Sequence, residues 1–142
     1  MKKKIIYGCE SRGDSDDPYL TRWEFISSKL FAIYLHKFHR SDDNSSLHDH
    51  PWRFITIPLW IGYNDCTYKG TTDKYGNPDF NKERLKPFSI RFRKSTHIHF
   101  VELLDNRPAW TLIIRFNYVR YWGFWKKGKF TRFDKYFQEN GC

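Results

Sequence analysis

Short runs of β-branched and aromatic residues, separated by turn-forming clusters, recur along most of the chain. We expect strands at residues 23–26, 30–38, 52–63, 88–92, 99–104 and 110–116. Such runs fit a pleated, half-buried surface, and several of them at near-regular spacing are typical of a β-sandwich or β-barrel. The sequence therefore predicts an all-β fold, in which Gly62 ends or bends the strand at 52–63.

Three features refine this expectation. Residues 63–87 are polar and contain turn signals, which predicts an excursion on the surface of the scaffold. From Phe88 to Arg93, apolar residues alternate with Ser89, Arg91 and Arg93, which predicts a strand with a buried apolar face and a polar face. The four tryptophans expected to line or pack the barrel are Trp52, Trp60, Trp110 and Trp122.

Length favours a single domain spanning residues 1–142. A chain of this size buries roughly 68% of its unfolded surface, and an aromatic content of 20% supplies a large apolar core. We expect a flexible or peripheral segment at 1–18. The three-and-four spacing of Phe130, Phe133 and Phe137 predicts that residues 125–142 form a helix packed on the barrel.

Cysteine usage and charge bear on location and partners. Cys9, Cys66 and Cys142 are scattered and odd in number, so we expect plain thiols in a cytoplasmic protein. No run approaches the 18 apolar residues of a membrane span, so no membrane association is expected. The net charge of +9 would attract anionic partners, but a solvated basic surface is the simpler explanation because the positive residues are spread along the chain.

The six histidines fall in two stretches, with His36, His39, His48 and His50 in the first and His97 and His99 in the second. Alternate residues of an extended chain share a face, so His48 and His50 converge while Asp49 points away. His97 and His99 share a face in the same way. A closed barrel could bring the two pairs together as three or four neutral nitrogen ligands for a divalent metal.

A structural explanation of these histidines remains open. His97 or His99 would then be a buried histidine that is hydrogen-bonded to a carboxylate such as Asp42 or Asp43. We expect His36, which lies inside a predicted strand, to have a structural hydrogen-bonding role, and His39 to be exposed.

Seven short motifs between residues 19 and 124 carry a family resemblance. They are YLTRW at 19–23, YLHKF at 34–38, SD at 41–42, LHDHPW at 47–52, HFVEL at 99–103, PAWTL at 108–112 and RYWGF at 120–124. In this order they resemble small cupin-like proteins of bacteria and phages, most of which have no established activity. Arg115-Phe116-Asn117 departs from the small turn-forming residues expected after PAWTL.

The resemblance implies a cupin-type double-stranded β-helix, or jelly-roll barrel, in which His48, His50 and His99 bind one divalent metal ion per chain. The glutamate expected four or five residues after His50 is replaced by Phe54 or Ile55. The site therefore resembles three-histidine cupins such as the thiol dioxygenases, or else it uses His97 as a further ligand.

Three neutral imidazoles leave a divalent ion with open coordination positions, which suits oxygenase chemistry on Fe(II) as well as Lewis-acid chemistry on Zn, Ni or Mn. Arg91, Arg93 and Arg120 could clamp a small anionic molecule, although surface or structural roles also fit them. We therefore predict a metal-binding protein that acts as an Fe(II) oxygenase.

Two other functions remain open. The barrel could be a non-catalytic ligand-binding or structural module with no need for the histidines. Basic and aromatic residues alternate at 124–130, which could serve a nucleic-acid binder, but no recognised nucleic-acid signature accompanies them. A homodimer is expected if exposed sheet edges pair.

Overall fold

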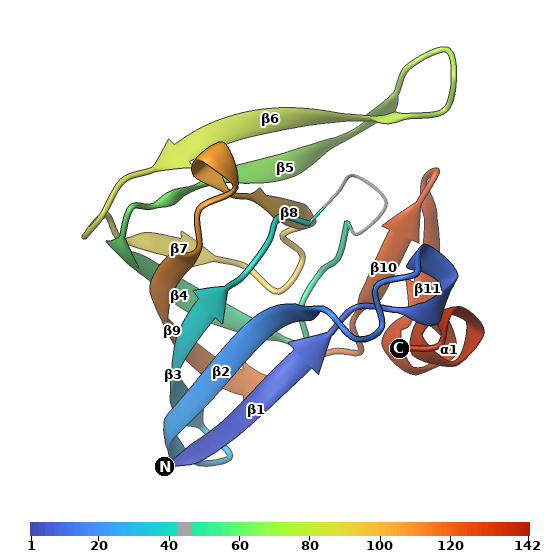
Figure 1. Ribbon diagram of the computed structural model, residues 1–142. Helices are drawn as coiled ribbons and strands as arrows, with labels where there is room; N and C mark the ends of the chain where they lie inside the picture. Colours follow the sequence, from blue (N-terminus) through green and yellow to red (C-terminus); the bar gives the residue numbers. More distant parts are fainter. Residues whose placement is uncertain (43–46) are drawn as a thin grey trace.

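Antiparallel strands form two sheets with a small third sheet beside them in a computed structural model that describes residues 1–42 and 47–142 (Figure 1). The larger sheet has the order β1-β2-β3-β9-β4-β7. Its strands are Lys2–Tyr7 (β1), Pro18–Ser27 (β2), Phe31–Phe38 (β3), Ala109–Tyr118 (β9), Trp52–Trp60 (β4) and Arg91–Arg93 (β7). The second sheet, of order β6-β5-β8, consists of Pro78–Leu85 (β6), Tyr63–Thr72 (β5) and His99–Glu102 (β8).

The chain ends in a hairpin and a short helix. The hairpin is formed by Gly123–Lys126 (β10) and Lys129–Arg132 (β11), and the helix is Phe133–Asn140 (α1). Short 3₁₀ segments lie at Glu10–Arg12 (η1) and Leu104–Asn106 (η3). The predicted all-β class with a short C-terminal helix is confirmed. No helix among the described residues is long and apolar enough to cross a membrane.

Alternation along the strands builds the core between the two sheets. In β3, Ala32, Tyr34, His36 and Phe38 are buried while the residues between them are partly exposed. One buried cluster joins both sheets: Leu20, Phe38 and Ala109 come from the larger sheet or its strand ends, and Tyr63, Leu85, Val101 and Leu103 come from the second sheet and its flank.

The turn from β4 to β5 moves the chain from one sheet to the other. Ile61 and Gly62 both have positive φ, at 67° and 81°, and a side chain at Gly62 would collide with the carbonyl of Leu85. The prediction that Gly62 ends or bends the strand is therefore confirmed.

Residues 63–87 differ from the expected surface excursion because they form β5 and β6, and β5 is the central strand of the second sheet. Polar residues pair here because β6 is an edge strand in which only Leu85 is buried. Inward-facing positions of β5 include the buried polar residue Asp65, which its neighbours neutralise.

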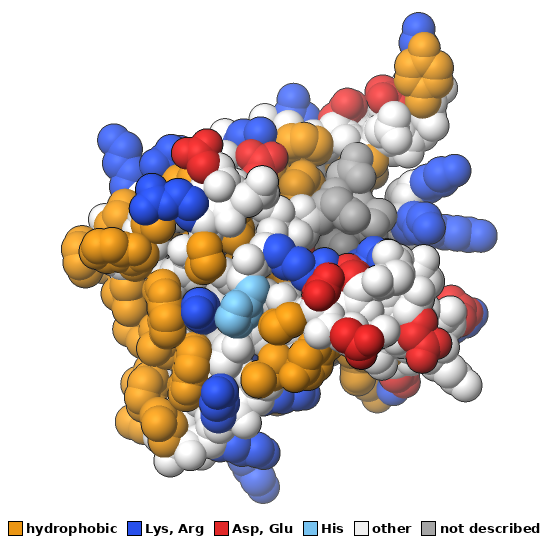
Figure 2. Space-filling view, in the orientation of Figure 1, with side chains coloured by type: hydrophobic (Ala, Val, Ile, Leu, Met, Phe, Trp, Pro, Cys, Tyr) orange, Lys and Arg blue, Asp and Glu red, His pale blue; other side chains and the backbone are white. Residues whose placement is uncertain are grey.

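The expected faces of the segment at 88–93 are reversed. Phe88, Ile90 and Phe92 are exposed, whereas the side chain of Arg93 is only 15% exposed and is ion-paired with Asp65. The ion pair with Asp65, a buried acid on the second sheet, thus determines which face of the segment at 88–93 points inward. Figure 2 shows apolar side chains gathered on the side of the molecule where β7, β9 and β3 lie.

Two other expectations need correction. Trp60 is 63% exposed and does not pack the barrel. The C-terminal helix begins at Phe133 rather than at residue 125, because β10 and β11 pair as a hairpin that includes Phe130. The N-terminal segment is peripheral, since β1 is an edge strand of the larger sheet.

The cysteines differ from the expected set of three thiols. Cys9 and Cys142 form a disulfide that joins the two ends of the chain, while Cys66 is free and buried. The backbone brings the ends together because Glu10 donates a hydrogen bond from its amide to the carbonyl of Gly141, at 3.0 Å. Separation in the sequence therefore gave no guide to proximity in the fold.

Candidate metal centre

A backbone bridge between two distant segments builds the candidate centre. His48 and His99 each donate an amide hydrogen bond to the other's carbonyl, both at 3.1 Å, in an antiparallel bridge. Residues paired in this way point their side chains to the same face. His50 is held by its own amide, which donates to the carbonyl of Ser95 at 3.1 Å.

The three imidazoles lie within contact distance of one another. Their ring centroids are 5.2 Å apart for His48 and His50, 4.9 Å for His48 and His99, and 4.9 Å for His50 and His99. One ligand nitrogen from each ring lies within 4.8 Å of the others. His50 and His99 are buried and His48 is partly buried, so the cluster lies inside the barrel rather than on its surface.

A hydrogen bond sets the tautomer of His99. Its Nδ1 lies 2.5 Å from Oδ1 of Asp65, and a carboxylate can only accept, so Nδ1 carries the proton. Burial lowers the pKa of His99 to about 4, although Asp65 opposes the shift, and the ring is therefore neutral near pH 7. Its Nε2 then presents a lone pair toward His50.

The geometry of the pair fits a shared ion. The Nε2 atoms of His50 and His99 are 3.3 Å apart. Two nitrogens bound at about 2.0–2.1 Å to a tetrahedral ion are separated by roughly 3.3–3.4 Å. The Nδ1 atom of His50 is buried and has no hydrogen-bond partner among the described residues, so no neighbour there dictates which nitrogen bears the proton. Burial also lowers the pKa of His50 well below its usual value.

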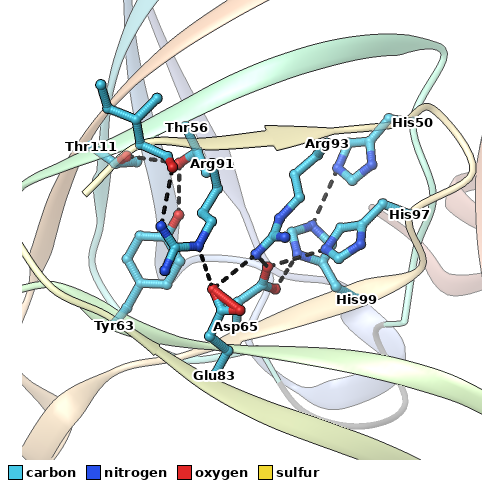
Figure 3. A network of polar contacts seen from close by, with 11 residues as sticks. His50, Thr56, Tyr63, Asp65, Glu83, Arg91, Arg93, His97, His99 and Thr111 are labelled. Atoms are coloured by element: carbon cyan, nitrogen blue, oxygen red, sulfur yellow. Dashed lines mark hydrogen bonds and ion pairs between the residues drawn. The ribbon is translucent and has the colours of Figure 1, made fainter. Parts of the chain in front are cut away.

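Asp65, on β5, organises the other side of His99 (Figure 3). Its side chain is 2% exposed, and its Oδ2 lies 2.8 Å from Nη2 of Arg93 and 3.1 Å from Nε2 of His97. Despite burial, the surrounding histidines hold the pKa of Asp65 well below its usual range. The carboxylate is thus ionised and holds three donors in place.

Asp65, His97 and His99 also form a set with metal-ligand spacing. This set is a poor cation site because the guanidinium of Arg93 already neutralises the carboxylate and would repel an ion there. The three-histidine set contains no carboxylate that a guanidinium already neutralises, so it is the better candidate.

His97 lies outside the three-histidine set and points toward Asp65 (Figure 3). The alternative of a histidine hydrogen-bonded to a carboxylate is thus realised by both His97 and His99, with Asp65 as the acid. Asp42 instead accepts from the amide of Val101 at 3.1 Å, and Asp43 lies outside the described residues.

Asp49 points away from the two histidines that flank it and anchors the C-terminal hairpin. It is 1% exposed and accepts from the amide of Gly123 at 2.8 Å and from Nε1 of Trp125 at 3.1 Å. It also forms an ion pair with Arg120, at 2.7 Å. These contacts fix the His48-Asp49-His50 segment from the side opposite the candidate centre.

The arginines selected from the sequence are all paired with acids. Arg91 lies 2.7 Å from Glu83, Arg93 is bound to Asp65, and Arg120 is bound to Asp49 and to the carbonyl of Ser95. Of the three, Arg93 lies beside the candidate centre through Asp65. The other two histidines lie elsewhere: His36 accepts from Nε of Arg22 at 2.9 Å, and His39 is partly buried beside Thr21.

Sequence reasoning missed Asp65. The only signal for it is the two-residue alternation of Tyr63, Asp65 and Thr67, which is weak inside a segment rich in turn formers.

No protein-family model matches the sequence, and no curated protein is similar to it in sequence. Solved structures share the fold. An Fe(II) HppE crystal structure superposes with a TM-score of 0.57 at 12% identity, covering 81% of this chain and 57% of that one. The DMSP lyase DddQ from Ruegeria pomeroyi gives 0.54 at 20% identity, covering 80% and 56%. A double-stranded β-helix protein from Klebsiella pneumoniae gives 0.53 at 12% identity, covering 72% and 81%.

These similarities show that the chain has the cupin, or double-stranded β-helix, fold. The chain spans little more than half the length of HppE and DddQ.

Proposed function

We propose that this chain is a divalent-metal-binding protein of the cupin fold that acts as an Fe(II) oxygenase on a small anionic molecule. The observation that carries the proposal is the convergence of three histidines, with the Nε2 atoms of His50 and His99 at the spacing of two ligands on one ion. An Fe(II) ion held there would supply redox chemistry and open coordination positions.

The surrounding residues suit a three-histidine centre. Phe54 stands four residues after His50, and its ring centroid lies 4.5 Å from that of His50. An apolar ring in this place excludes water from one side of the histidines and contributes no charge. Asp65 keeps the proton of His99 on Nδ1, which leaves Nε2 free to bind a metal.

The choice of Fe(II) has support from a structural neighbour. HppE is described as an Fe(II) protein in the structures that superpose on this chain. Neutral imidazoles also accept Zn, Ni and Mn, so affinity alone does not select iron.

Metal titration tests the proposal. Metal-free protein is titrated anaerobically with Fe(II), and separately with Zn, Ni and Mn, and the bound metal is counted by elemental analysis. We expect one ion per chain. Replacing both His48 and His50 by alanine should weaken binding at least 100-fold while the far-ultraviolet circular dichroism is retained.

His39→Ala is the matched control, because His39 lies beside Thr21 and outside the cluster. A stoichiometry far below one for every metal, or equal binding by the double variant and the control, would contradict the proposal.

A non-catalytic binding or structural module is the second candidate. Trp52 and Phe54 both pack on His50, and the cavity beside Arg115 that is described below is not lined by a histidine. Nitric oxide distinguishes the candidates, since it binds Fe(II) only where a coordination position is open. A nitrosyl signal in electron paramagnetic resonance supports the oxygenase; its absence in protein loaded with one Fe(II) supports the module.

A further inference from the structure

Arg115 is a buried cation in the larger sheet. It lies on β9 between Ala32 of β3 and Phe54 of β4, which are its register partners and are themselves buried. Residues paired across neighbouring strands share a face, so the side chain of Arg115 points into the barrel. Its exposure is 6%.

The partners of Arg115 are all neutral. Its Nε donates to the hydroxyl of Tyr34 at 3.2 Å, its Nη1 to the carbonyl of Phe116 at 3.3 Å, and its Nη2 to the hydroxyl of Ser27 at 3.4 Å. Among residues 1–42 and 47–142, no carboxylate lies within ion-pair distance of it, unlike Arg91, Arg93 and Arg120. A buried charge without a counter-charge is costly, and an anion would relieve that cost.

A second guanidinium adds to the positive potential. Arg22 on β2 lies with its guanidinium carbon 4.7 Å from the ring centroid of Tyr34, while Arg115 binds the hydroxyl of the same tyrosine. Burial is the main cause that lowers the pKa of Arg22, and the charge of Arg115 lowers it further, whereas Glu24 opposes the shift. The two cations therefore act on each other across Tyr34.

Arg115 lines an open cavity of about 470 Å³ at the end of the larger sheet where β2 turns into β3 (Figure 1). The lining residues are Ser27, Ser28, Lys29, Arg115, Asn117 and Tyr118. They include two cations and no acid. A guanidinium has five N–H donors, of which three are used here, so donors remain for a ligand in this cavity.

We propose that this cavity binds the anionic group of a small molecule, a carboxylate or a phosphate, through Arg115 with Lys29 at its rim. Phe54 on β4 is the register partner of Arg115, and its ring contacts that of His50, so β4 connects Arg115 with the three histidines. The anion site stands without the metal centre, because its cations and hydroxyls come from β2, β3, β9 and the turn between β2 and β3.

Titration of metal-free protein with sodium phosphate and, separately, with sodium acetate tests this proposal. Ionic strength is held constant with sodium chloride, and binding is followed by two-dimensional NMR. We expect one saturable site for at least one of the two anions, with a dissociation constant in the millimolar range. The anion with the lower dissociation constant shows whether the ligand is a phosphate or a carboxylate.

Arg115→Gln should weaken this binding at least tenfold. Arg53→Gln is the matched control, since it removes the same charge from an exposed position on β4 and should bind as the wild type does. Equal binding by the two variants would show only long-range attraction by a basic protein and would overturn the proposal. Absence of saturable binding by both anions would overturn it too.

The proposal can be tested even if the Arg115→Gln variant does not fold. Arg115→Gln removes an uncompensated charge, so the variant should unfold at the same or a higher urea concentration than the wild type. If it fails to fold, Lys29→Gln decides the matter, because Lys29 is exposed on the turn between β2 and β3. That variant should bind the anion at least threefold more weakly, and unchanged binding would overturn the proposal.

Discussion

The two ring nitrogens of His99 face different partners: Nδ1 lies 2.5 Å from Oδ1 of Asp65, and Nε2 lies 3.3 Å from Nε2 of His50. The contact with Asp65 keeps the proton on Nδ1 and orients the ring. The lone pair of Nε2 then points toward the neighbouring histidines. A carboxylate that orients a ligating histidine raises its basicity and its affinity for metal. Asp65 on β5 thus supports the candidate centre through His99 on the neighbouring strand β8.

Asp65→Asn should weaken metal binding by about 10- to 100-fold, because the neutral amide holds His99 less firmly than a carboxylate does. Competition with a metal-binding dye measures the change. Asp79→Asn is the control, since the carboxylate of Asp79 accepts only from the hydroxyl of Thr71 among the contacts described. Unchanged affinity in Asp65→Asn would show that the contact does not support the metal centre.

Arg93 and Arg91 should differ in their contribution to stability. Arg93 is 15% exposed and neutralises the buried Asp65, whereas Arg91 is 39% exposed and pairs with Glu83, which is 45% exposed. Breaking the buried pair leaves an uncompensated charge and should lower the free energy of unfolding by about 3 kcal/mol. The exposed pair contributes less than about 1 kcal/mol.

Urea denaturation of Arg93→Gln and Arg91→Gln compares the two arginines directly. Equal destabilisation would mean that Asp65 does not depend on Arg93.

Acid should destabilise the metal-free protein through its buried histidines. Burial lowers the pKa values of His36 and His50 well below the usual 6.5 and that of His99 to about 4. The unfolded chain takes up these protons near pH 6.5 and the folded chain does not, so stability is full above pH 6.5 and falls as the pH drops toward 4. His99 alone should account for about 2–3 kcal/mol at pH 4.5.

Urea denaturation at pH 7.5, 5.5 and 4.5 measures this loss. Asp65 does not interfere, because its lowered pKa would cost stability only below about pH 4. A free energy of unfolding that stays constant from pH 7.5 to 4.5 would contradict the account of buried neutral histidines.

The disulfide between Cys9 and Cys142 should appear in a thiol count. Under denaturing, non-reducing conditions one thiol should react with Ellman's reagent, and after reduction three should react. In the native state Cys66 should react slowly, because burial raises the pKa of its thiol to about 11.

Reduction of the disulfide should lower the free energy of unfolding by about 2–4 kcal/mol, since the bond closes a loop of nearly the whole chain. Cys66→Ala provides the control, as it leaves the disulfide intact. Three reactive thiols without reduction would mean that the ends of the chain are not joined.

Periodicity predicted the parts of the fold that depend on local pattern. The alternation in β3 and the shared face of His48 and His50 follow from the two-residue period of a strand, and Asp49 faces the other way as expected. The resemblance to cupin-like proteins pointed to the jelly-roll fold, which the superposed structures show.

Contacts between residues far apart in the sequence determined the features of the fold that the local pattern did not predict. Phe88, Ile90 and Phe92 turn outward because Arg93 is drawn to Asp65, an acid 28 residues earlier in the chain on another sheet. Nothing local in the sequence links those two residues. In the same way the sequence placed Arg115 in a strand without showing which way it faces, and only its place between β3 and β4 shows that it is a buried cation.

A crystal of the Fe(II)-loaded protein, measured on both sides of the iron absorption edge, tests the central claim most directly. We predict one anomalous peak per chain, within about 2.0–2.3 Å of a nitrogen from each of His48, His50 and His99, with Asp65 still bound to the far nitrogen of His99. A crystal without iron at this place, or with iron bound by Asp65 and His97 instead, would contradict the account.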